Sequence, residues 1–217
     1  MIMKVPGEWK WASHTPLIEG VLDLYKPQMV LELGCGLHST PLFQIDDIIY
    51  KGVDNDLEWI GRVETELGVE IEYHNLHGID RTTLWSSLSI LQKKNIKEYY
   101  QNLCVRSFVL MNSGPKLLFV DGFACTRKIA IDVLKSHFDI IIYHDSQRTK
   151  AGVFNHLYNQ KEEPGFAKYH LTSVRNWTSI MVKVDKGIVA LRNSVAPHIS
   201  KFYVQWGKNV GMEIKQL

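Results

Sequence analysis

The chain has 217 residues, of which 45% are hydrophobic and 22% are charged, a balance typical of a globular domain rather than a disordered or fibrous chain. This length fits one domain, or one domain with an extension. Lys and Arg number 25 against 23 Asp and Glu, so the net charge is only +2, and no stretch concentrates basic residues. We therefore expect no nucleic-acid partner, because phosphate binding needs a basic surface.

The cysteines and the first residues indicate the compartment. Cys35, Cys104 and Cys125 lack the close spacing of a zinc site or a disulfide framework, and we interpret them as reduced thiols. Lys4 and Pro6 interrupt the first apolar residues, which is unlike a signal peptide. No apolar run approaches the length of a membrane span. We expect a cytoplasmic protein without membrane contact.

In chain order, the pattern predicts alternating helices and strands. The expected elements are a helix at 16–25, a strand at 29–33, a short helix from Pro41, strands at 48–53, 69–73 and 117–120, a helix at 127–136, and a strand at 140–143. Three of these strands are continuously apolar, as in a parallel sheet covered on both faces. Five such β–α units predict a doubly wound α/β fold.

The later segments complete the predicted sheet. A helix is expected at 151–160, and strands at 169–174 and 179–184 are close enough to form an antiparallel hairpin. The expectation is one seven-stranded, mostly parallel, Rossmann-like domain over 1–217, with its core at about 15–185 and a C-terminal extension at 187–217. A helical insert at 76–115 either packs on the sheet or forms a wall of the ligand pocket.

Candidate ligand-binding residues lie at the carboxyl ends of the predicted strands, where open α/β sheets bind ligands. Gly34 and Gly36 allow a sharp turn and a close approach to a ligand, because neither has a Cβ. Ser39 precedes a short helix whose amides favour negative groups. Asp54 follows the second strand, where a carboxylate can accept ribose hydroxyls. These residues alone fit S-adenosylmethionine and NAD equally.

Further acidic positions favour S-adenosylmethionine. Glu32 lies two residues before Gly34, where a carboxylate suits a cationic amino-acid group and repels a pyrophosphate. Asp121 follows the fourth strand, and His144 and Asp145 follow the fifth. These three side chains are expected near a transferred methyl group, because these strand ends lie beyond the ribose-binding end. The antiparallel final strands are also typical of methyltransferases.

Four segments together resemble the class I S-adenosylmethionine-dependent methyltransferases. They are 30–36 (VLELGCG), 52–56 (GVDND), 119–122 (FVDG, with Arg127 after it) and 142–148 (IYHDSQR). The first looks like the cofactor loop, although His38 stands where the family has a third glycine. The resemblance covers about residues 15–185. The last two segments are also similar to glucuronoxylan O-methyltransferases, which suggests a sugar hydroxyl as methyl acceptor.

The resemblance implies a role for each candidate residue. The residues expected at the cofactor are Glu32, Gly34, Cys35 (through its backbone), Gly36, Ser39, Asp54 and Asn55. The residues expected at the methyl-transfer site are Asp121, His144 and Asp145. A carboxylate or imidazole there can take the proton of a hydroxyl acceptor. Asp121 and Asp145 can also hold magnesium, but Ser146 stands where such sites have an amide ligand, so a metal is not favoured.

The predicted function is therefore methylation of a small-molecule or sugar hydroxyl. An NAD-dependent oxidoreductase is the alternative enzyme, disfavoured by Glu32 and by the lack of a recognisable substrate domain. A nucleoside-binding protein without catalysis is the alternative from another class, because the cofactor loop persists in such proteins. Consumption of the cofactor separates the last alternative from an enzyme. The oligomeric state is not predicted.

Overall fold

The computed structural model describes residues 12–76, 78–80, 83–105, 114–144, 164–172, 178–206 and 212–216. The helices in these ranges are α1 (Thr15–Tyr25), α2 (Thr40–Phe43), α3 (Leu57–Leu67), α4 (Ile90–Val105), α5 (Ala124–Leu134) and α7 (Ile188–Trp206). The strands are β1 (Met29–Leu33), β2 (Ile49–Asp54), β3 (Ile71–Tyr73), β4 (Lys116–Val120), β5 (Ile140–Tyr143), β6 (Ala167–Thr172), β7 (Thr178–Val182) and β8 (Glu213–Gln216). The helix expected at 151–160 lies outside the described residues.

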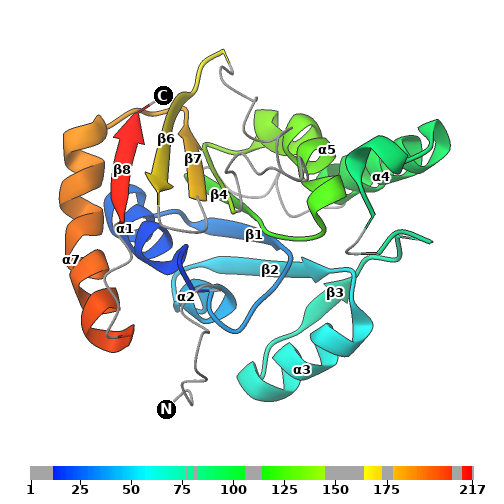
Figure 1. Cartoon of the computed structure of the whole chain (residues 1–217), viewed down its shortest axis with the longest axis horizontal. Coiled ribbons are helices and arrows are strands. Elements are labelled where there is room, and N and C mark those ends of the chain that lie inside the picture. Colours follow the sequence, from blue (N-terminus) through cyan, green and yellow to red (C-terminus); the bar gives the residue numbers. More distant parts are fainter. Residues whose placement is uncertain are drawn as a thin grey trace.

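The strands form one sheet in the order β3-β2-β1-β4-β5-β7-β6-β8 (Figure 1). The first five pair in parallel, whereas β7 is antiparallel to β5, and β6 is antiparallel to both β7 and β8. This confirms the predicted doubly wound, mostly parallel fold with an antiparallel final pair. The sheet also has an eighth strand, β8, which the sequence did not reveal.

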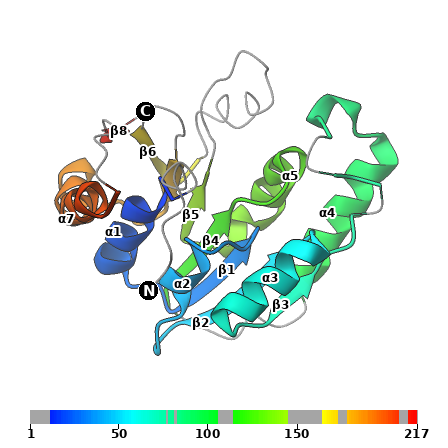
Figure 2. The ribbon, with the colours of Figure 1, turned by 60° about the horizontal axis from the view of Figure 1, so that its bottom comes forward.

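Both faces of the sheet are covered, and β4 shows why. Leu117 and Phe119 belong to a buried cluster with residues of α1, α2 and α7, while Leu118 and Val120 belong to a second cluster with α4 and α5. Alternate residues of a strand point to opposite faces, so a strand buried on both faces is apolar throughout. Figure 2 shows α1 and α7 on one side of the sheet, and α3, α4 and α5 on the other.

One helix starts earlier than the sequence predicts, and the helical insert follows one of its two predicted alternatives. α5 begins at Ala124 rather than at Arg127, because its first turn follows directly after Gly122. Thr126 does not cap this helix: its hydroxyl donates to the carbonyl of Phe123 instead. α4 lies in the expected insert and buries Ile96 in the cluster it shares with α5. In the described part of the insert no residue lines the pocket described below, so α4 packs on the sheet.

The C-terminal extension covers one edge and one face of the domain. α7 packs along α1, where a Cβ on Gly20 would collide with Val195. Ser194 donates to the carbonyl of Gly20 at 2.8 Å. β8 pairs with β6, and Arg192 of α7 donates twice to the carbonyl of Ile214 in β8. Among the described helices, none is both long enough and apolar enough to cross a bilayer.

Candidate active site

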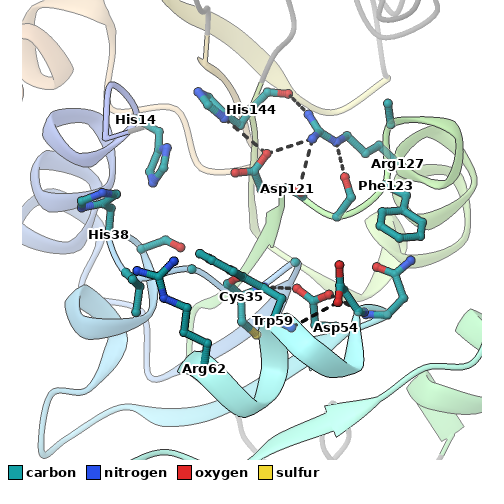
Figure 3. Close-up of a pocket in the computed structure, with 18 residues that line it drawn as sticks. His14, Cys35, His38, Asp54, Trp59, Arg62, Asp121, Phe123, Arg127 and His144 are labelled. Atoms are coloured by element: carbon teal, nitrogen blue, oxygen red, sulfur yellow. Dashed lines mark hydrogen bonds and ion pairs between the residues drawn. The ribbon is translucent and has the colours of Figure 1, made fainter. Parts of the chain in front are cut away.

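A pocket of about 570 Å³ lies at the carboxyl ends of β1, β2, β4 and β5 (Figure 3). The order of the sheet reverses between β1 and β4, and such a switch point is where open α/β sheets bind ligands. The residues that line the pocket are His14, Gly34, Cys35, Gly36, Leu37, His38, Ser39, Asp54, Asn55, Asp56, Trp59, Arg62, Asp121, Gly122, Phe123, Ala124, Arg127 and His144.

The two glycines of the β1 loop have different reasons to be glycine. Gly34 has φ +90°, and a Cβ there would collide with the backbone of Gly122. The amides of Asp121 and Gly122 both donate to the carbonyl of Leu33, so Gly34 lets the exit loops of β1 and β4 pack together. A Cβ on Gly36 would instead enter open space, with only the Ser39 hydroxyl at 3.4 Å. Gly36 is therefore the glycine that leaves room in the pocket.

The carboxylate of Asp54 joins the ends of β1 and β2. One oxygen accepts the amide of Cys35 at 2.9 Å, and the other accepts the amides of Asn55 at 2.6 Å and Asp56 at 3.0 Å. A carboxylate offers about four lone-pair positions, so these three bonds leave about one for a ligand. Burial, opposed by these amide bonds, raises the pKa of Asp54 to about 6. The backbone of Cys35 also accepts the indole N–H of Trp59 at 2.7 Å.

Glu32 supports the loop from below and does not line the pocket. Its side chain is fully buried, and one carboxyl oxygen accepts hydroxyls from Thr40 at 2.8 Å and Tyr50 at 2.6 Å. Thr40 in turn accepts the amide of Gly36 at 3.0 Å. Burial raises the pKa of Glu32 to about 7, although neighbouring hydroxyls partly oppose this. The other Glu32 carboxyl oxygen has no hydrogen-bond partner within 3.5 Å among the described residues, although the Ser39 hydroxyl is one of the groups that lower the pKa of Glu32.

Asp121 and His144 meet at the ends of β4 and β5. His144 Nδ1 lies 3.3 Å from Asp121 Oδ1, and Arg127 of α5 forms a 3.0 Å ion pair with the same oxygen. Arg127 also donates to the carbonyls of Asp121, Gly122 and His144. This buried guanidinium thereby fixes both strand ends and the Asp121 carboxylate, as the dashed lines in Figure 3 show.

His14, just before α1, completes this side of the pocket. Its ring lies edge-on to His144, with ring centroids 4.7 Å apart, and tilted against Phe119. The side chain is 3% exposed, and within the described part of the chain neither ring nitrogen has a hydrogen-bond partner. Burial and then the neighbouring His144 lower the pKa of His14 to about 3, so its imidazole is neutral.

Most of the predicted site residues lie around this one pocket. Those that line it are Gly34, Cys35, Gly36, Ser39, Asp54, Asn55, Asp121 and His144. Glu32 lies behind the loop, and Asp145 is outside the described residues. The pocket is also lined by His14, Trp59, Arg62 and Phe123, which were not among the predicted site residues. Trp59 and Arg62 could have been predicted from the sequence, because they follow Asp56 on the first turns of α3, the helix after the second strand.

Comparisons with known proteins give a fold likeness and no family. No protein-family model matches the chain, and no curated protein matches it. A methyltransferase-like protein from Silicibacter pomeroyi DSS-3 is similar in structure, with 13% identity, a TM-score of 0.47, and coverage of 90% of this chain and 96% of that one. EvdMO1 is similar over 77% of this chain and 40% of its own, with 15% identity and a TM-score of 0.36. Both likenesses are weak, because both TM-scores are below 0.5.

Proposed function

We propose that the chain is an S-adenosylmethionine-dependent methyltransferase that methylates a hydroxyl of a small molecule or sugar. The observation that supports this proposal is that the backbone amides of the loop after β1 already donate hydrogen bonds within the protein. Cys35 donates to Asp54, and Gly36 donates to Thr40. These amides are engaged within the protein, so they do not form the free anion cradle that a pyrophosphate needs.

The pocket lining also suits a nucleoside with a cationic group better than a dinucleotide. Carboxylates of Asp54 and Asp121 line it from two strand ends, and α2, the helix after the loop, has only four residues. A helix this short offers a weak positive terminus for a phosphate. NAD carries two phosphates, whereas S-adenosylmethionine carries a sulfonium and a ribose. The lining therefore favours S-adenosylmethionine over NAD.

The residues of the pocket fit S-adenosylmethionine in size and chemistry. A volume of about 570 Å³ is within the range of small-molecule sites. The remaining lone pair of Asp54 would accept one ribose hydroxyl. The side-chain amide of Asn55, the next residue, would bind the other hydroxyl. Gly36 would leave room for the methionine portion, and Phe123 would offer an apolar wall. The buried Glu32 would act through Thr40 by holding the loop, rather than through the direct contact expected from the sequence.

Bound there, S-adenosylmethionine supplies a methyl group activated by its positively charged sulfur. Asp121 and His144 would orient the acceptor hydroxyl, because they line the pocket at the strand ends beyond Asp54. Arg127 would keep both of them in place. Asp145, adjacent to His144, stays a predicted third member of this group. Alignment of the two reactants contributes much of the rate in such transfers.

Calorimetry tests the proposal with S-adenosylmethionine, its demethylated product and NAD as ligands. We expect the first two to bind and NAD to bind at least tenfold more weakly. Gly36→Val should abolish that binding without unfolding the protein, because its side chain would enter the open space of the pocket. Gly61→Val is the matched control, since nothing lies within 4 Å of a Cβ at Gly61.

The outcome decides between the candidate functions. Tight NAD binding without S-adenosylmethionine binding would overturn the proposal in favour of an oxidoreductase. Binding without turnover across a screen of sugars, phenols and small acids would indicate a nucleoside-binding protein. The sugar acceptor, the cytoplasmic location and the absence of nucleic-acid and membrane partners stay predictions.

A further inference from the structure

His14 is a buried polar group that the proposed methyl transfer does not explain. Both of its ring nitrogens are buried, and neither has a hydrogen-bond partner among the residues that the structure describes. Burial of a polar group without a partner is unfavourable, so native proteins rarely contain such a group without a reason. The residue also lines the pocket beside His144 and Asp121 rather than lying in a closed core. Figure 3 shows His14 and His144 on the same side of the pocket, across from Cys35 and Asp54.

The donor atoms of these three residues lie at the spacing of a metal site. One ligand atom from each of His14, Asp121 and His144 lies within 4.8 Å of the other two. His144 Nδ1 and Asp121 Oδ1 are 3.3 Å apart. Two ligands of a tetrahedral ion with bonds of about 2.0–2.1 Å are separated by about 3.3 Å. That pair already has the required spacing, and the His14 nitrogen, which lies within 4.8 Å of both, would have to move closer to become the third ligand.

We propose that His14, Asp121 and His144 bind a divalent transition-metal ion. Two imidazoles and one carboxylate are a donor set for zinc and its first-row neighbours, whereas magnesium and calcium prefer oxygen ligands. Three protein ligands leave an open position, as in catalytic rather than structural sites. This set differs from the Asp121 and Asp145 pair that the sequence suggested, and it needs no amide ligand at Ser146.

The neighbours of the three ligands support the assignment. Ser13 Oγ lies 3.4 Å from His144 Nε2, so it can form a hydrogen bond with this nitrogen while Nδ1 faces the metal. A ligating histidine usually has such a partner on its other nitrogen. Arg127 forms a 3.0 Å ion pair with Oδ1 of Asp121, which holds this carboxylate next to His144 Nδ1.

The position of the site suggests what the ion does. It lies on the side of the pocket where the acceptor hydroxyl is expected, and this role rests on the proposed function. An acceptor hydroxyl at the open position would pass its proton to water more easily, because the bound cation would stabilise the alkoxide that remains. The pocket would then need no separate carboxylate base next to His144.

Titration calorimetry of tag-free, chelator-treated protein tests the site with zinc alone and with magnesium alone. We expect one zinc ion per chain, and no comparable binding of magnesium. His14→Phe keeps the shape of the ring and its contact with Phe119, so the protein should fold while its zinc affinity falls about a hundredfold or more. His14→Gln replaces this variant if circular dichroism shows that His14→Phe does not fold. Cobalt added in place of zinc should give visible absorption bands that the variant lacks.

His198→Ala is the matched control. This imidazole pairs with Asp23 and Glu19 on α1, away from the pocket, so its removal should leave zinc binding unchanged. Equal zinc affinity in the native protein and the folded His14 variant would overturn the proposal, as would weak zinc binding by the native protein. S-adenosylmethionine is titrated into the same samples. Native protein that binds S-adenosylmethionine but not zinc rejects the metal site alone, and native protein that binds zinc but not S-adenosylmethionine rejects only the methyltransferase.

Discussion

At the scale of single residues, the carboxylates of this pocket do different work although their sequence positions look alike. Asp54 and Glu32 both lie next to the glycine loop, and both are buried. Asp54 accepts three backbone amides and still lines the pocket, whereas Glu32 accepts two hydroxyls behind it. A sequence motif gives the type of residue at each position. The direction in which each side chain points depends on neighbours such as Tyr50, which lies outside the motif.

The raised pKa of Glu32 predicts how stability depends on pH. Its value of about 7, against 4.5 for an unperturbed carboxyl, means that the folded chain holds this proton more tightly than the unfolded chain. The stabilisation is complete below pH 4.5 and is lost as the pH rises through 7. It amounts to on the order of 3 kcal/mol. Glu32→Gln, which mimics the protonated acid, should remove this fall in the free energy of unfolding.

Urea unfolding at a series of pH values measures this effect. Glu58→Gln is the control, because Glu58 is an exposed carboxylate on the first turn of α3. That variant should keep the slope of the native protein. An unchanged slope in Glu32→Gln would show that another group causes the pH dependence.

At the scale of elements, the central strands were predictable because both of their faces are buried. Continuous apolar runs located β1, β4 and β5 to within one residue. The tail was not predictable in the same way. β8 buries only Ile214 of its four residues, and such a strand is defined by its pairing with β6 rather than by its own pattern. The pocket was predictable where residues follow strand ends, and not at His14, which comes from the segment before α1.

Arg127 joins three elements, and its replacement should show how much that junction stabilises the domain. From α5 it donates to carbonyls at the ends of both β4 and β5. Arg127→Lys keeps the charge but loses the planar fork, so at least one buried carbonyl loses its partner. We expect a fall of about 2–3 kcal/mol in the free energy of unfolding. Arg62→Lys, which alters an exposed pair with Glu66, should cost less than about 0.5 kcal/mol in the same urea titration.

At the scale of the whole molecule, the sheet order brings the site together. Asp54, Asp121 and His144 are far apart in the sequence, but β2, β4 and β5 end at the same edge of one parallel sheet. The antiparallel strands β6 and β8 lie at the other side of the sheet from β3, and their described residues do not line the pocket. Ligand binding at the switch point and coverage of the β6 edge by β8 therefore depend on different parts of the sheet.

Removal of residues 212–217 tests that separation. The truncated chain loses β8 and the buried side chains of Met212 and Ile214, so its free energy of unfolding should fall by about 3 kcal/mol. The uncovered edge of β6 should also favour self-association, because an unpaired strand edge is a template for pairing. S-adenosylmethionine affinity, measured by calorimetry below the unfolding temperature, should stay within about threefold of the full chain, because that change is only ~0.6 kcal/mol. A truncated protein that is folded and monomeric but no longer binds this ligand would show that the tail shapes the pocket.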